Sequence, residues 1–413
     1  MSAATQMSLA PEGTASSAAA EAIVTEATKA CDRRYRHRLR ALILTGSLAR
    51  GEGSAVVDDG VCRLLGDAEF LLVFARRRAI PDEGKLRGLA ESISAATRER
   101  GIACRVDLAG VAPGYLRRLP RHIFSYELRQ DGRVVLGNPA ILELVPEFLP
   151  TEIDREDAWR LLSNRMVEWL RELASVPDEA GAPSLGLIYA TVKLWLDAAT
   201  SLLVFLGGYE PSYRARGRRL AALAREPHLA LPFPLADFET GLETATRWKL
   251  APDLAANRRP GWEFCARARD LAGKLWCWEM AELTGLDPAY PPMALVQAWT
   301  RRNGPGRRWR GWLRAAREQG WLRSRRCWRH WRELSRDGSP RHCIYGLAAE
   351  CVMRQEDFSP GTREGAASAW KLATLRRYLP VPHAPARANG CGWRALACDL
   401  ACNYRWFVEK TRA

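Results

Sequence analysis

Apolar and polar positions follow two different periods along this chain, and the change falls near residue 150. Before it, short apolar runs such as Leu42–Leu44 and Phe70–Phe74 are bounded by glycine, serine and acidic residues, which is typical of buried β-strands. After it, apolar residues recur every three to four positions, as in amphipathic helices. The pattern predicts the α+β class, with an N-terminal α/β domain on a short mixed sheet followed by a mostly α-helical C-terminal region.

The same spacing places individual helices. Residues 82–100 carry Leu86, Leu89 and Ile93 on one face, so this segment is expected to form a helix between two strands. Ser184 is a suitable N-cap for a long apolar helix that Gly207-Gly208 would end. Further helices are expected at residues 18–38, 154–173, 262–283 and 365–379.

Length and composition set the domain organisation. The 413 residues are enough for two or three domains, and a hydrophobic content of 47% is ample for packed cores. Residues 1–20 are rich in alanine, serine and threonine and lack the features of a signal peptide, so they are expected to be a disordered lead. The remaining domains are expected to be the sheet-containing domain at 21–150, a helical bundle at 151–290 and an Arg/Trp-rich helical region at 291–413.

Three carboxylates lie in predicted strands. Asp67 and Glu69 open the apolar run that continues to Phe74, and their i, i+2 spacing puts both side chains on one face of a strand. Asp107 lies in a later apolar strand, and the strand–helix–strand order would bring it beside this pair. Because neighbouring carboxylates repel each other, such a group is typical of a divalent cation site.

A glycine–serine turn precedes the carboxylate pair. Gly46-Ser47 follows a buried run and can present backbone N–H groups and a hydroxyl to a phosphate. A phosphate-binding turn beside metal carboxylates is the combination that phosphoryl and nucleotidyl transfer require. Each feature alone has a simpler interpretation, because Gly-Ser turns are common in loops and an Asp-x-Glu strand end is often only a solvated edge.

Two hairpins are predicted from turn chemistry. Residues 54–65 contain Asp59-Gly60 between two β-rich runs, and residues 123–137 contain Asp131-Gly132 between two others. An Asp-Gly pair flanked by such runs favours a tight hairpin turn. Residues 123–129 are therefore expected to form a strand.

Taken together and in this order, these segments resemble the nucleotidyltransferase domain of the DNA polymerase beta superfamily, especially its small bacterial branch of minimal and aminoglycoside nucleotidyltransferases. The resemblance covers roughly residues 38–140, about a quarter of the chain. It rests on Gly46-Ser47, Arg50-Gly51-Glu52, Asp67-Ala68-Glu69, Asp107 and the run ending in Val135-Leu136-Gly137.

The resemblance implies a nucleoside triphosphate donor, with ATP as the default, an acceptor hydroxyl that it does not identify, and two divalent ions, Mg²⁺ or Mn²⁺. The residues that it assigns are, for the metals and for catalysis, Asp67, Glu69 and Asp107, and, for the nucleotide, Gly46, Ser47, Arg50 and Glu52. For Arg50 and Glu52 the implied role is either positional or directed at phosphate.

The chain departs from the family pattern at two places. Residues 54–65 intrude between the turn and the carboxylate pair, but a hairpin keeps its two ends close, so the site can survive the insertion. Glu69 stands where the family more often has aspartate, and its longer side chain would move a bound metal.

Lys193 is the residue of interest in the predicted bundle. It is one of seven lysines in the chain, and it lies one helical turn before Asp197. Two interpretations remain open, an i, i+4 ion pair within a buried helix or a cation that binds the triphosphate. Tyr209, Tyr213 and Arg214 follow the Gly-Gly stop and could line the same cleft.

Basic charge is concentrated in residues 298–336. The net charge of the chain is +15, and thirteen arginines against two glutamates give this segment +11 by itself. With six interleaved tryptophans, this composition is typical of a surface for nucleic acid or another polyanion, and a basic wall that attracts a triphosphate is a further alternative. The simplest interpretation is an amphipathic helix with its apolar positions inward; these positions are Trp309, Trp312, Leu313 and Ala316.

The eleven cysteines are scattered and contain no Cys-x-x-Cys pair, which favours reduced thiols and a cytoplasmic protein. The most apolar stretch, residues 185–206, contains a lysine and an aspartate, so it is expected to be a buried helix, and no membrane partner is expected.

Three functions are compatible with these observations. The first is a metal-dependent nucleotidyltransferase, the second a nucleic-acid-binding protein on the same scaffold, and the third an inactive nucleotide-binding regulator. We prefer the first because the turn and the three carboxylates occur in the order that transfer chemistry needs.

Overall fold

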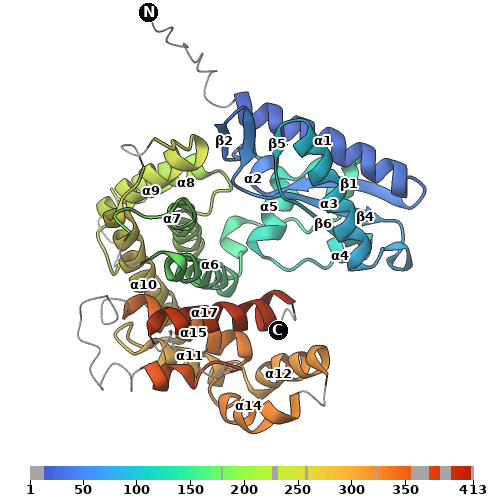
Figure 1. The fold of residues 1–413 in the computed structure, drawn as a ribbon. Helices are drawn as coiled ribbons and strands as arrows, with labels where there is room; N and C mark the ends of the chain where they lie inside the picture. Colours follow the sequence, from blue (N-terminus) through green and yellow to red (C-terminus); the bar gives the residue numbers. More distant parts are fainter. Residues whose placement is uncertain are drawn as a thin grey trace, which may run out of the picture. The chain divides into compact units, whose positions relative to one another are not determined.

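The computed structural model describes residues 14–177, 180–225, 231–255, 259–320, 324–354, 372–381 and 392–410 (Figure 1). They form an α+β protein with small mixed sheets, as the sequence predicts.

The chain divides into two compact units. The first unit takes the chain up to Asp154 together with residues 207–219 and 243–259, and the second takes the rest. The division after Asp154 lies near the boundary expected at 150, but two later segments return to the first unit. The regions expected as separate domains at 151–290 and 291–413 both contribute to the second unit.

A helix begins inside the segment expected to be disordered. Helix α1 spans Thr14–Tyr35, so the expectation of disorder is wrong for residues 14–20, while residues 1–13 lie outside the described part of the chain. Ala19, Ile23 and Ala27 are spaced four apart and are buried with the sheet residues. This apolar stripe stabilises the helix despite the small side chains around it.

The main sheet of the first unit has the order β6-β4-β1-β7. Strand β4 is antiparallel to β1 and parallel to β6, and β1 is antiparallel to β7. The bounds of the strands are Leu39–Thr45 for β1, Ala68–Phe74 for β4, Val106–Val111 for β6 and Arg133–Gly137 for β7.

Helices cover both faces of this sheet. One face packs against α1 and α3 (Glu83–Glu99), and α3 is the helix expected at 82–100, with the Asp82 side chain as its N-cap. The other face packs against α4 (Pro113–Leu116) and α5 (Ile123–Asp131). Figure 1 shows these blue and cyan elements around the strands.

The hairpin predicted at 54–65 is present. Strands β2 (Ala55–Asp58) and β3 (Val61–Leu64) are antiparallel. Asp59 and Gly60 form the turn with positive φ of 48° and 76°, as a type I′ turn requires. Strand β3 also pairs in parallel with β5 (Ile102–Ala103), so the insertion forms its own small sheet.

The second predicted hairpin is wrong in its first half, because residues 123–131 form helix α5. The Ser125 hydroxyl accepts a hydrogen bond from the His122 backbone N–H at 3.1 Å, and Ile123 and Leu128 are buried. Gly132 follows the last helical residue, and its N–H donates to the Leu128 carbonyl at 3.2 Å. The Asp-Gly pair therefore ends a helix, and only the following strand, β7, matches the prediction.

The second unit is built from helices. The expected helices at 154–173, 184–206 and 262–283 are confirmed as α6, α7 and α10, and the Ser184 hydroxyl caps α7 by accepting from the Leu187 N–H at 3.1 Å. For the helix expected at 365–379, residues 365–371 lie outside the described residues. The bounds are Arg155–Ser175 for α6, Leu185–Phe205 for α7, Trp262–Thr284 for α10, Pro292–Arg302 for α11, Pro305–Gln319 for α12, Trp328–Leu334 for α14, Pro340–Met353 for α15 and Trp393–Tyr404 for α17. Two further helices, α8 (Tyr213–Leu223) and α9 (Leu235–Leu250), contain the points where the chain passes between the units.

Buried tryptophans form much of the core of the second unit, and some of their indole N–H groups are hydrogen-bonded. The Trp169 indole N–H donates to the Thr191 hydroxyl at 3.0 Å, and that of Trp276 donates to the Ser163 hydroxyl at 2.8 Å. Within the described residues, α7 is the one helix long and apolar enough to cross a membrane, and 83% of its most apolar window is buried in the structure.

Helix α12 is amphipathic, but its buried face differs from the prediction. Trp312, Ala315 and Ala316 are buried, whereas Trp309 and Leu313 are 37% and 45% exposed. The Trp312 ring packs on Trp331 of α14, with 5.5 Å between ring centroids. This contact fixes the rotation of α12, which the spacing of apolar residues alone left undetermined.

Candidate functional site

The structure brings two of the three predicted carboxylates into register. Glu69 of β4 and Asp107 of β6 are direct partners on adjacent parallel strands, which lie about 4.8 Å apart. The expectation that Asp107 lies beside the Asp67/Glu69 strand is thus confirmed. Asp67 precedes β4 by one residue, and the alternation of side chains along an extended chain places it on the same face as Glu69.

These carboxylates lie where one face of the sheet changes from buried and apolar to exposed and polar. Leu71 and Val73 share the face of Glu69 but are buried in the cluster that contains residues of α4 and α5. Asp67 and Glu69 are exposed, and the Asp107 side chain is 46% exposed. The rigid strands therefore present acidic side chains to solvent at one end of an otherwise covered surface.

The Gly46-Ser47 turn lies directly against Glu69. It forms the short helix α2 (Gly46–Ala49) after β1. Gly46 has a φ of +70°, and a Cβ atom there would lie 2.9 Å from Glu69 Oε2. The backbone conformation therefore favours glycine, and a Cβ atom there would displace the Glu69 carboxylate. The Ser47 carbonyl accepts a hydrogen bond from the Glu52 N–H at 2.8 Å, which ties the turn to the segment that follows.

The carboxylate oxygens of Asp67, Glu69 and Asp107 are ligands that suit a hard cation, although they do not form a complete coordination shell. Within the part of the chain that the structure describes, no three His, Cys, Asp or Glu side chains gather into a metal site. Mg²⁺ is commonly held by one or two carboxylates with water and substrate phosphates completing its shell, so the Glu69/Asp107 pair fits this ion. Asp107 also forms an exposed ion pair with Arg105, with 3.3 Å between Oδ1 and Nη2.

Arg50 and Glu52, which the family resemblance assigns to nucleotide binding, are enclosed by protein. Their side chains are 7% and 5% exposed, and Arg50 Nε lies 3.3 Å from Glu52 Oε2. Arg50 Nη1 also forms an ion pair of 2.9 Å with Glu127 Oε2. Of the two roles that the sequence left open, this geometry favours the positional one.

Arg216 is the centre of the same group. Its side chain is 3% exposed, and Nη2 lies 3.1 Å from Glu127 Oε1. It also donates to the Tyr209 hydroxyl at 2.9 Å and to the Pro211 carbonyl at 2.8 Å. The guanidinium lies over the Tyr209 and Tyr213 rings, 5.2 and 4.9 Å from their centroids. We call the set Arg50, Glu52, Glu127, Tyr209 and Arg216 the buried ion network.

The buried ion network fastens the returning segment 207–219 to the first unit. Glu52 Oε1 accepts from the Ser212 hydroxyl at 2.8 Å and from the Tyr213 N–H at 3.0 Å. Tyr209 donates to Glu127, and burial, together with the Glu127 carboxylate, raises the pKa of Tyr209 well above its usual value. The tyrosine therefore remains a neutral donor. The second returning segment is held through the Lys249 carbonyl, which accepts from the Ser54 hydroxyl at 2.6 Å.

Sequence reasoning missed three members of this arrangement. Glu127 was expected on a strand, and Arg216 and Ser212 were not singled out. Ser212 and Glu52 are 160 residues apart in the chain, so no local pattern connects them. The one available signal was the position of Tyr209 and Tyr213 after a glycine stop, which was interpreted as a cleft lining; instead Tyr209 is 2% exposed.

Lys193 and Asp197 belong to the second unit. Asp197 forms an ion pair with Arg165 of α6, with 2.6 Å between Oδ2 and Nε, and the Lys193 ammonium lies 5.1 Å from the centroid of the Tyr189 ring. The expected role of Lys193 toward a nucleotide stays a prediction.

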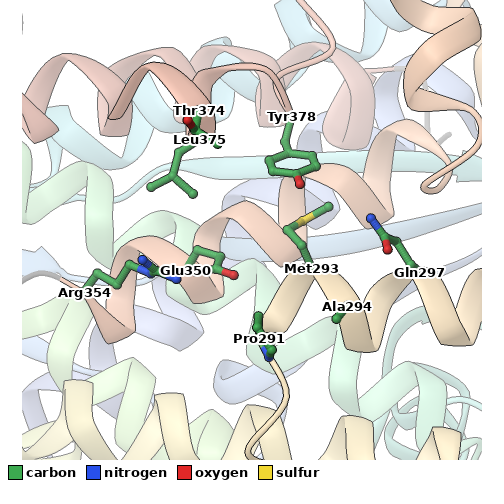
Figure 2. Close-up of a pocket in the computed structure, with 9 residues that line it drawn as sticks. All are labelled: Pro291, Met293, Ala294, Gln297, Glu350, Arg354, Thr374, Leu375 and Tyr378. Carbon is green, nitrogen blue, oxygen red and sulfur yellow. Dashed lines mark hydrogen bonds and ion pairs between the residues drawn. The ribbon is translucent and has the colours of Figure 1, made fainter. Parts of the chain in front are cut away.

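A separate pocket of about 380 Å³ lies in the second unit (Figure 2). Glu350 on its wall has a side chain only 5% exposed and accepts from Arg354 Nε at 2.8 Å. In Figure 2 the Tyr378 ring and the Glu350 carboxylate are both directed toward the space around Met293. The lining residues are Pro291, Met293, Ala294, Gln297, Glu350, Arg354, Thr374, Leu375 and Tyr378.

Comparisons of the chain with protein-family models, curated proteins and solved structures return no match. A functional assignment therefore depends on the residues and the geometry described above.

Proposed function

We propose that the first unit is a nucleotidyltransferase-type domain that moves a nucleoside monophosphate from a nucleoside triphosphate to an acceptor hydroxyl. The observation that carries the proposal is the register of Glu69 with Asp107 on parallel strands, with the Gly46 turn packed against the Glu69 carboxylate. This arrangement supports the proposal, because a turn that could bind phosphate and two carboxylates that could bind a cation lie at one end of the same sheet.

The proposed roles follow from these positions. The Gly46-Ser47 turn offers backbone N–H groups and a hydroxyl to the triphosphate. Asp67, Glu69 and Asp107 would hold divalent ions, and such ions, when bound, neutralise phosphate charge and promote ionisation of the acceptor hydroxyl. Asp107 is alternatively placed to accept the proton of that hydroxyl. Arg50 and Glu52 would hold the Gly46-Ser47 turn in position, because the Glu52 N–H donates to the Ser47 carbonyl and Arg50 pairs with Glu52.

The proposal is tested by the melting temperature of the full chain with each nucleoside triphosphate, with and without Mg²⁺. A ligand that binds only the folded state raises the melting temperature by mass action. We expect a Mg²⁺-dependent rise for at least one triphosphate, with ATP as the first candidate. The rise should be lost in Asp67→Asn, because that change removes a metal ligand without adding bulk.

Asp58→Asn is the matched control, because Asp58 is an exposed carboxylate in the β2–β3 hairpin of the same unit. The control should keep the full nucleotide response. If no triphosphate raises the melting temperature, or if Asp67→Asn responds as the wild type does, the nucleotide site is assigned wrongly.

An inactive nucleotide-binding regulator on the same scaffold is the alternative. Release of pyrophosphate from the bound triphosphate distinguishes the transferase from the regulator, because nucleotidyl transfer produces pyrophosphate and binding alone does not. The acceptor is unknown, so release should be measured with water and with mixed small-molecule and RNA hydroxyl acceptors. Mg²⁺-dependent nucleotide binding without release under every condition would favour the regulator.

A further inference from the structure

Helix α12 carries an exposed basic stripe beside an exposed apolar one. Arg310, Arg314 and Arg317 are all exposed, and their i, i+4, i+7 spacing places them on one face of the helix. Trp309 and Leu313 lie next to this stripe and are 37% and 45% exposed. The opposite face of α12 is buried, so the orientation of the helix in the second unit is fixed by packing.

Arginines outnumber carboxylates on this surface, because Glu318 is the one acidic residue of α12. No carboxylate of the described residues lies within ion-pair distance of Arg310 or Arg317. The neighbouring helix α14, joined to α12 through the Trp312–Trp331 contact, presents two more exposed arginines, Arg329 and Arg332. From residue 298 to 336 the exposed arginines of the described chain are Arg301, Arg302, Arg310, Arg314, Arg317, Arg326, Arg329, Arg332 and Arg336.

We propose that this surface, the outer face of α12 with the adjoining arginines of α14, binds single-stranded RNA. Guanidinium groups match phosphate in a bidentate geometry, and a stripe of arginines can follow a sugar–phosphate backbone. The exposed Trp309 ring next to that stripe offers a stacking platform for an unpaired base. A duplex keeps its bases stacked inside, so it would use the arginines and leave the tryptophan without a partner.

The same surface fits an anionic membrane less well. The main apolar face of α12 is occupied by the protein core through Trp312, Ala315 and Ala316, so that face cannot enter a bilayer. Only Trp309 and Leu313 remain, and the strength of interfacial binding scales with the apolar area that a helix can bury. This inference is independent of the nucleotide site proposed for the first unit.

The test is fluorescence anisotropy of a labelled single-stranded 20-nucleotide RNA with the full chain, repeated at several salt concentrations. In Arg310→Ala/Arg314→Ala/Arg317→Ala the affinity should fall at least tenfold at low salt. The slope of log affinity against log salt should become shallower by about two, because about 0.7 counterions are released for each single-strand phosphate that is neutralised. Trp309→Leu should weaken binding about tenfold with little change in that slope, and Trp309→Phe should restore most of the affinity, since base stacking requires an aromatic ring.

The matched control is Arg76→Ala/Arg77→Ala/Arg78→Ala, which removes three exposed arginines from the first unit. It makes the same change in net charge, and it should leave the RNA affinity within about twofold of the wild type. Far-ultraviolet circular dichroism and the melting temperature of each triple variant show whether the fold is kept, and all replaced side chains are exposed.

Three results would overturn the proposal. Equal losses in both triple variants would mean attraction by net charge alone. Equal affinity for a double-stranded RNA of the same length, with no effect of Trp309→Leu, would mean backbone binding without stacking. Binding to phosphatidylserine vesicles but not to RNA would identify a membrane surface instead.

Discussion

Two sets of arginines, one in each unit of this protein, differ in their burial. In the first unit, Arg50 and Arg216 are 7% and 3% exposed in their side chains, and each contacts carboxylates and aromatic rings. In the second unit, Arg310, Arg314 and Arg317 of α12 are exposed to solvent. The residue type is the same, but a buried guanidinium is held by contacts within the chain, whereas an exposed one remains hydrated.

A buried charge needs partners within the protein. A guanidinium removed from water is tolerated only when ion pairs and hydrogen bonds replace its hydration, and Arg216 obtains these from Glu127, Tyr209 and backbone carbonyls. The network therefore fixes the segment after the Gly46 turn, whereas exposed arginines cost little and contribute little to stability until a polyanion binds them.

We expect the largest effect from Arg216→Ala, because it removes the central arginine of the buried ion network. It removes one of the two arginine partners of the half-buried Glu127, which keeps only Arg50, and it leaves the buried Tyr209 hydroxyl without that contact. The free energy of unfolding should therefore fall by about 3–5 kcal/mol. Urea unfolding followed by circular dichroism measures the loss. Arg218→Ala is the matched control, because Arg218 is exposed on the same helix, and it should change stability by less than about 0.5 kcal/mol. Comparable losses in the two variants would show that the network is not what stabilises the first unit.

A buried acid in the second unit should give an effect of similar size, but only at alkaline pH. Burial raises the pKa of Glu279 to about 8, with the Ser201 hydroxyl opposing part of the shift. The folded state therefore holds the proton more tightly than the unfolded state, whose glutamates titrate near pH 4.3. Stability should be full below this pH, fall as the pH rises toward 8, and level off above it.

Glu279→Gln should remove most of this pH dependence and stabilise the protein at pH 8.5 by about 3–5 kcal/mol, since each unit of pKa shift corresponds to about 1.4 kcal/mol. Melting temperatures from pH 5 to 9 provide the measurement. Glu282→Gln, at an exposed position of the same helix, should keep the wild-type profile. A profile unchanged by Glu279→Gln would mean that this carboxyl ionises in the folded protein at an ordinary pH.

The smallest expected effect on stability tests the role of the Gly46 turn. Gly46→Ala and Gly51→Ala both place alanine at a φ of +70°, but a Cβ meets Glu69 Oε2 at 2.9 Å only at Gly46 and finds open space at Gly51. Each should lose about 1–2 kcal/mol to backbone strain, as measured by chemical denaturation. The added displacement of Glu69 should reduce the Mg²⁺-dependent triphosphate response in Gly46→Ala only. Equal responses in the two variants would separate Glu69 from the nucleotide site.

Local sequence patterns were sufficient to predict the elements that are specified by interactions between nearby residues. The type I′ turn at Asp59-Gly60 follows from the turn residues themselves, and α3 follows from its Asp82 cap and apolar spacing. The position of Asp107 beside the strand of Glu69 also followed from the sequence, because consecutive strands joined by a helix are usually neighbours in a sheet, whereas their exact register came from the structure. These parts include the carboxylates of the candidate site.

The sequence by itself determined the α+β class, the strands that carry Glu69 and Asp107, and the long helices of the second unit, because each depends on periodicity within one segment. The tertiary structure decided that residues 123–131 form a helix, that α12 exposes Trp309, and that Arg216 joins Arg50 around Glu127. Each of these depends on a surface supplied by residues distant in sequence. Packing against such a surface contributes more free energy than the local propensity of a few residues, and no local pattern records it.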